Sequence, residues 1–152
     1  MTHARPLFLA CLVLAACEGG GADGSRPARE PRPPPMAASV TVRDGEGAEG
    51  PFRLEDLQTL ALEIRVVAAP PGPMPLRIDV LTPANVVYAQ LPVTLEPDLS
   101  GTAAVRQDLE VQGTPIEGLR MTGAWTFRLA PAGGTAPLAT AEAQIAEAEI
   151  AE

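Results

Sequence analysis

The 152-residue chain lacks lysine and has almost no histidine or cysteine. The one histidine is His3, and the two cysteines are Cys11 and Cys17. Beyond residue 17 the sequence therefore offers no Ser–His–Asp triad, no cysteine nucleophile and no Cys/His zinc site. Without lysine there is also no Schiff base and no phosphate-binding P-loop. Only carboxylate chemistry remains, and we expect a protein that is not an enzyme and needs no cofactor.

Basic charge is scarce as well. The chain has eleven arginines and 19 acidic residues, so its formal net charge is −8. Nucleic acids and anionic lipid surfaces are both bound through basic faces, so the balance argues against either as a partner. The longest apolar run, Leu7–Ala16, is about half as long as a membrane-spanning helix requires.

Residues 1–16 have the organisation of an export signal. Arg5 and the amino terminus supply positive charge, and the apolar run Leu7–Ala16 follows at the length typical of a signal peptide. The run ends in Leu14-Ala15-Ala16-Cys17. This tetrapeptide resembles the lipobox of bacterial lipoproteins and matches it at every position. A plain secretory signal, or a short buried helix that happens to end in cysteine, is the alternative.

The resemblance implies a lipid anchor. In that family the thiol at the position of Cys17 receives a diacylglyceryl group, and a signal peptidase that recognises the positions of Leu14, Ala15 and Ala16 cuts before it. Two or three acyl chains anchor far more firmly than one. Glu18 replaces the aspartate that favours inner-membrane retention in enterobacteria. We therefore expect a protein of the cell envelope, and the sequence favours the outer membrane over the inner membrane as its location.

Residues 17–38 have the composition of a disordered tether. The first part is rich in glycine and the second in proline, and its arginines and acids are equal in number. Such a segment reaches on the order of 50 Å. The alternative interpretation is that the proline-rich part is a docking peptide for a partner that recognises proline.

From residue 39 onward, short runs of alternating apolar and polar residues are separated by turns, as in half-buried strands. The expected strands are Ser39–Arg43, Leu60–Val67, Leu76–Val80, Val86–Leu91, Ala104–Val111, Gly123–Leu129 and Leu138–Ile145. No helix is required, although Glu55–Thr59 could form one turn. About seven antiparallel strands at this spacing predict an all-β sandwich over residues 39–152, ending in an acidic tail whose conformation is open.

The closing part of this domain resembles a known family. Val111–Ile116, Met121–Leu129 and Ala139–Ala143 are similar to the final hairpin of bacterial immunoglobulin-like and macroglobulin-like domains, in which a Gly-x-Trp strand precedes a turn and a last strand. The resemblance implies a single immunoglobulin-like sandwich, and it assigns a function to no particular residue.

Two aromatic residues could serve a ligand or the core. Trp125 shares its face with Phe127 and Leu129, which favours core packing over sugar stacking. Tyr88 falls within an expected hairpin and is better explained as a half-buried strand residue than as a binding platform.

Acidic residues give weaker candidates. Asp44, Glu46 and Glu49 lie within six residues among glycines, and calcium prefers oxygen ligands on such loops, but the spacing is not that of an EF-hand. The expectation is therefore no metal, with these three as the weak candidate. The pairs Glu96/Asp98 and Asp108/Glu110 could in principle act as a glycosidase acid and base, although a solvated strand face explains them more simply.

These observations predict a non-catalytic, membrane-anchored envelope lipoprotein, a structural, adhesion or assembly module that binds another envelope protein through a sheet edge or loops. The alternative is a binding module for a small molecule, a glycan or Ca²⁺.

Overall fold

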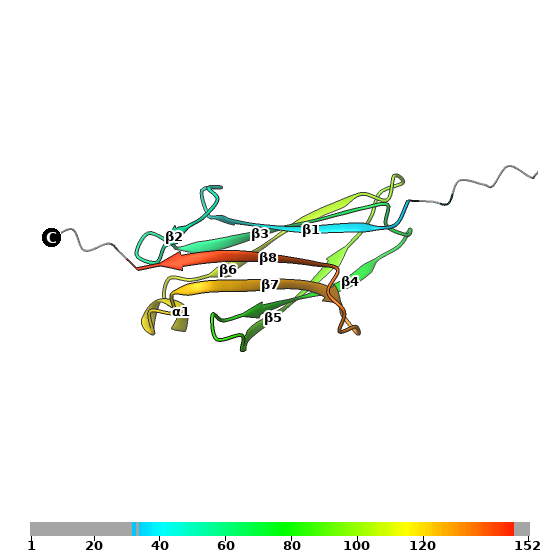
Figure 1. Ribbon diagram of the computed structural model, residues 1–152. Helices are drawn as coiled ribbons and strands as arrows, with labels where there is room; N and C mark the ends of the chain where they lie inside the picture. Colours follow the sequence, from blue (N-terminus) through cyan, green and yellow to red (C-terminus); the bar gives the residue numbers. More distant parts are fainter. Residues whose placement is uncertain (1–31, 33, 148–152) are drawn as a thin grey trace, which may run out of the picture. The chain divides into compact units, whose positions relative to one another are not determined.

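The computed structural model describes residue 32 and residues 34–147. This part of the chain contains eight strands and one short helix (Figure 1). In order they are β1 (Ala37–Asp44), β2 (Phe52–Arg53), β3 (Thr59–Val67), β4 (Met74–Leu81), β5 (Val87–Leu95), β6 (Ala103–Glu110), α1 (Pro115–Gly118), β7 (Gly123–Pro131) and β8 (Ala139–Ala146). Each of the seven predicted segments coincides with one strand, and the additional strand is the two-residue β2.

The strands form two sheets. One has the order β1-β3-β6, and the other has the order β2-β8-β7-β4-β5. All neighbours are antiparallel except β2 and β8, which run parallel. The chain crosses repeatedly between the sheets, and β7 and β8 form the closing hairpin. This strand order defines an immunoglobulin-like β-sandwich, so the predicted all-β fold class is confirmed.

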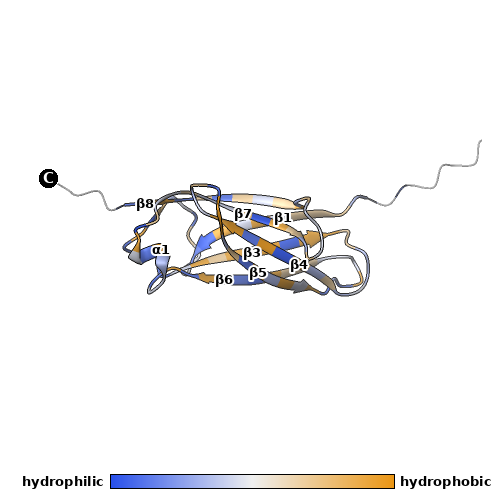
Figure 2. Ribbon diagram, turned by 90° about the horizontal axis from the view of Figure 1, so that it is seen from below, coloured by the Kyte–Doolittle hydropathy of each residue, from blue (hydrophilic) through white to orange (hydrophobic). Residues whose placement is uncertain are grey.

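The core lies between the inner faces of the sheets. Along β3 the residues Leu60, Leu62, Ile64 and Val66 are at most 1 % exposed, whereas Glu63 and Arg65 between them face solvent. The same alternation of hydrophobic and hydrophilic residues runs along β4 (Figure 2). No buried residue in the described part of the chain is polar or charged. Each fully buried aliphatic side chain contributes roughly 1.5–3 kcal/mol, and apolar burial therefore holds the sheets together.

Strand β5 continues four residues beyond its predicted end at Leu91 because Pro92 is tolerated at a sheet edge. The amide of Ala132 donates to the carbonyl of Pro75 at 3.1 Å, so the backbone of Pro75 faces β7. By the alternation of an antiparallel ladder, Arg77 also faces β7, and Pro92, which lies opposite Arg77, faces away from β4. Its missing N–H therefore costs no hydrogen bond within the sheet.

The helix α1 is a single turn, and it is the one helix in the described part of the chain. No sequence pattern predicted a helix at this place. Thr114 caps it, accepting from the amide of Ile116 at 3.3 Å, and Pro115 occupies its first turn, where a missing N–H is harmless. Ile116 is fully buried and fixes the turn to the core.

The two ends of the sandwich differ in what they carry. Strand β1 begins at Ala37, opposite Val67, at what we term the proximal end. It runs roughly 25 Å to Asp44 at the distal end. The distal end also holds β2, α1, the turn between β4 and β5, and the end of β8 (Figure 1). Whatever precedes residue 37 therefore joins the domain at the end opposite these loops.

Candidate functional site

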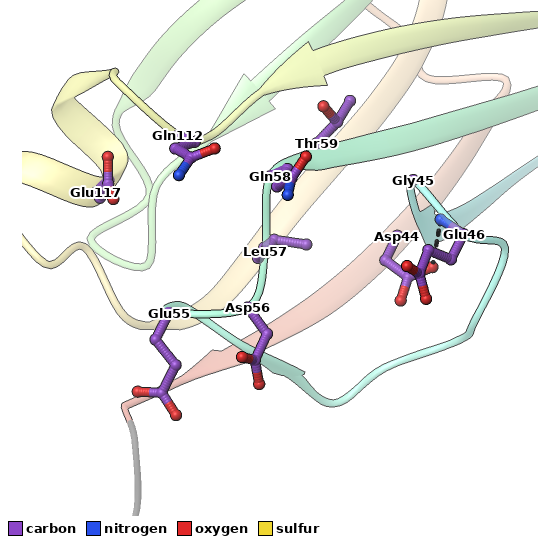
Figure 3. A pocket seen from close by; sticks show the side chains of 10 residues that line it. All are labelled: Asp44, Gly45, Glu46, Glu55, Asp56, Leu57, Gln58, Thr59, Gln112 and Glu117. Carbon is purple, nitrogen blue, oxygen red and sulfur yellow. Dashed lines mark hydrogen bonds between the residues drawn. The ribbon is translucent and has the colours of Figure 1, made fainter.

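A hollow lies at the distal end of the sandwich. It has a volume of about 610 Å³ and is open to solvent (Figure 3). Three separate segments form its wall: the end of β1 with the following loop, the turn between β2 and β3, and the segment around α1. The lining residues are Asp44, Gly45, Glu46, Glu55, Asp56, Leu57, Gln58, Thr59, Gln112 and Glu117.

Hydrogen bonds connect two of the three segments that line this hollow, which we term the distal depression. The carbonyl of Gln58 accepts from the amides of Val111 at 2.9 Å and Gln112 at 3.1 Å, which ties the turn before β3 to the segment after β6. The carboxylate of Glu117 accepts a hydrogen bond from the amide of Gly113 at 2.7 Å and so stabilises the turn that leads into α1.

The depression is acidic throughout. Five of its ten lining residues carry a carboxylate and none is basic. The side chains do not converge on one point, and the described residues contain no group of three acidic, histidine or cysteine side chains that could hold a metal ion. Such a field attracts cationic groups without fixing any one of them.

The three residues considered for calcium are separated. Asp44 and Glu46 line the depression, whereas Glu49 turns away and pairs with Arg43 at 3.1 Å. One carboxylate oxygen of Asp44 accepts from the amides of Glu46 at 3.0 Å and Ala48 at 2.7 Å. Asp44 therefore braces its own loop, and the loop's fold explains this carboxylate without a metal.

A comparison of two loop variants tests this structural role. Asp44→Ala is expected to lower the free energy of unfolding by about 1 kcal/mol, because two amides lose their acceptor. The matched variant Glu46→Ala is expected to change it by less than about 0.5 kcal/mol. The measurement is urea unfolding of both variants with and without CaCl₂. A calcium-dependent rise in stability that both variants abolish would contradict this assignment.

Three of the four carboxylates in the two acidic pairs have structural partners. Asp98 accepts from the hydroxyl and amide of Ser100 and from the amide of Thr102, and closes the loop between β5 and β6. The hydrogen bond from the Ser100 side chain is the main cause of the lowered pKa of Asp98, followed by that from the Thr102 amide. Asp108 pairs with Arg106 at 2.7 Å, and Glu110 accepts from the Thr59 hydroxyl at 3.1 Å.

Trp125 belongs to the core, as its strand position predicted. Its side chain is fully buried, and its indole N–H donates to the carbonyl of Met121 at 2.9 Å. The ring of Tyr88 meets it edge to face, with centroids 5.5 Å apart and an interplanar angle of 83°. A fully buried indole cannot stack on a sugar, which leaves Tyr88 as the half-buried neighbour that covers it.

The predicted anchor residues Cys17, Leu14, Ala15 and Ala16 lie outside the described residues, as does most of the predicted tether. Within the described part of the chain, no helix is both long and apolar enough to cross a membrane. Glu55, Asp56 and Glu117 have no sequence signal for a site, because they belong to other segments than Asp44 and only the fold brings them to one hollow.

No protein-family model matches the chain, and no curated protein matches it. Among solved structures, an immunoglobulin-like protein from Pseudomonas aeruginosa is similar to this chain, with 12 % sequence identity and a TM-score of 0.46. The match covers 75 % of this chain and 98 % of the other. The assignment of the fold rests on the strand order given above.

Proposed function

We propose that this protein is a membrane-anchored, non-catalytic lipoprotein of the bacterial envelope whose immunoglobulin-like domain binds another envelope protein. The four-residue lipobox at Leu14–Cys17 supports the anchor, and the glycine- and proline-rich segment that follows supports a tether. The anchor confines the domain near one membrane and raises its effective concentration for a partner there.

The observation that carries the proposal is the direction of β1. The tether joins the domain at Ala37, and the strand ends roughly 25 Å away at Asp44. The loop after β1, α1 and the end of β8 therefore lie at the end of the sandwich opposite Ala37 (Figure 1), and the acidic depression is formed there. A domain held in this way presents its loops and its sheet edges to other molecules of the envelope.

A second candidate is a binding module for a small cationic molecule at the distal depression. Its support is the hollow of about 610 Å³ with five carboxylates in its wall. The two proposals differ in the mass of what is bound, so one experiment separates them.

The test is photo-crosslinking in growing cells of the source bacterium. A photoreactive amino acid is placed in the lipidated full-length protein at Glu55 on the distal end, at Glu142 on β8, or at Leu99 on the exposed proximal loop. We expect a discrete protein adduct from Glu55 or Glu142 and none from Leu99, and we expect the adduct to weaken when Cys17 is replaced by serine. An absence of adducts from all three positions would refute protein binding and favour the small-ligand module.

A further inference from the structure

The outer edge of β8 is hydrogen-bonded to no other described strand over most of its length, although β1 runs close beside β8. On one side β8 pairs with β7 from Ala139 to Ile145. On the other side the two-residue strand β2 pairs with Ile145 and Ala146 alone. Gly50 and Pro51, which precede β2, belong to no strand, so the pairing does not continue back along β8.

The hydrogen bonds of β2 show which backbone groups this edge exposes. The amide of Leu54 donates to the carbonyl of Ala146 at 3.0 Å, so the backbone of Ala146 faces β2. Because backbone groups alternate in direction along a strand, those of Thr140 and Glu142 point to the same side. No strand among the described residues pairs with them there, and such a row of unpaired groups is a template for another strand.

A groove accompanies this open edge. It has a volume of about 490 Å³ and lies between β1 and β8, with Phe52 and the residues before it closing its distal end. Val40 and Val42 contribute apolar surface from β1, and Ala141 and Ala143 contribute it from β8. Val42 and Ala143 are buried in the core, so of these four side chains those of Val40 and Ala141 remain partly exposed to an added strand.

The groove's charge limits what can fill it. Its only charged lining residues are Glu49 and Glu142, and both are acidic. Glu49 is already paired with Arg43, whereas Glu142 forms no ion pair within the described residues. An added strand that carries a basic side chain next to Glu142 would complement this charge.

The opposite edge of the same sheet is less suited to strand addition. There the outer side of β5 includes Pro92, which interrupts the row of donors in the way that protects natural sheet edges. Between Thr140 and Gln144 strand β8 contains no proline.

We infer that the partner docks by strand addition at the open edge of β8. The occupant is an extended segment of another protein in which apolar and basic residues alternate, its backbone paired with Thr140 and Glu142 and its apolar side chains in the groove between β1 and β8. This inference rests on the proposed function and specifies where, and by what kind of segment, the partner is bound.

The test uses the full-length lipidated protein in detergent micelles and a capped synthetic peptide of about eight residues in which valine and arginine alternate. Bound peptide is expected to slow amide hydrogen exchange at Thr140 and Glu142 by about tenfold or more, because their N–H groups become paired. The same peptide methylated on alternate backbone nitrogens is the control, since it keeps the side chains and loses the donors.

Variants at the two edges of the sheet locate the effect. Glu142→Pro removes an outward N–H without removing a bond to β7 and is expected to weaken binding about tenfold or more. Glu142→Arg keeps the backbone and is expected to weaken it through like charge, which covers the case of a misfolded proline variant. Gln90→Pro, on the outer side of β5, is the matched control and should bind as the unchanged protein does.

Three outcomes would overturn the inference. They are an absence of peptide-dependent protection at Thr140 and Glu142, equal protection along β5, or equal binding of the methylated peptide. The proposed function has a separate readout, because a cellular adduct from Glu55 without one from Glu142 would retain a protein partner while rejecting this docking site.

Discussion

Replacing Trp125 with alanine is expected to lower the free energy of unfolding by about 3–5 kcal/mol. The indole is fully buried, its N–H donates to the carbonyl of Met121, and its ring packs edge to face with the ring of Tyr88. Its loss leaves a large cavity in a core that has few other aromatic residues to refill it. Domains of this size are stable by about 5–15 kcal/mol, so this one substitution removes a large share.

Urea unfolding followed by far-ultraviolet circular dichroism is the appropriate measurement, because the variant has lost the only tryptophan. Trp125→Phe keeps a ring but loses the hydrogen bond to Met121, and its expected cost is about 1–2.5 kcal/mol. Tyr88→Phe keeps the edge-to-face contact and should change stability by less than about 0.5 kcal/mol. A loss below about 1 kcal/mol in Trp125→Ala would show that the core does not depend on this side chain.

Replacing Cys17 with serine is expected to abolish lipid attachment and to release the protein from the membrane fraction. A hydroxyl does not substitute for the thiol as acceptor of the diacylglyceryl group, and the sequence beyond residue 17 holds no other cysteine. The expected change is complete, since under the proposed function both membrane retention and processing would depend on the same sulfur.

Intact-mass analysis of membrane and soluble fractions measures this effect. The native protein should begin at Cys17 and carry acyl chains, and the variant should carry none. Cys11→Ser is the matched control, because Cys11 lies within the apolar run that the proposed cleavage would remove. A native protein that begins elsewhere, carries no lipid and remains soluble would sink the lipoprotein proposal and favour a free secreted domain with a soluble ligand.

The strands of the domain could be predicted because each leaves a local pattern. Leu60, Leu62, Ile64 and Val66 alternate with polar residues, and the structure buries these four. The face shared by Trp125 and Phe127 was equally informative. The end of β5 was less predictable, since whether Pro92 interrupts a strand depends on whether that strand lies at an edge.

The candidate sites could be predicted only in part. Asp44 and Glu46 were recognised as a local cluster, but Glu49 pairs with Arg43, and Glu55, Asp56 and Glu117 join the distal depression from other segments. The open edge of β8 had no signal in the sequence, because Ala139–Gln144 reads as an ordinary half-buried strand whether or not a neighbour covers its outer side.

The sequence by itself determined the strand pattern, the fold class and the lipobox resemblance, because hydrophobic periodicity and short motifs are properties of neighbouring residues. Only the tertiary structure decided that β1 begins at the end of the sandwich opposite the acidic depression and that most of the outer edge of β8 pairs with no other described strand. These features arise from strand order and register, which depend on contacts between residues far apart in the chain.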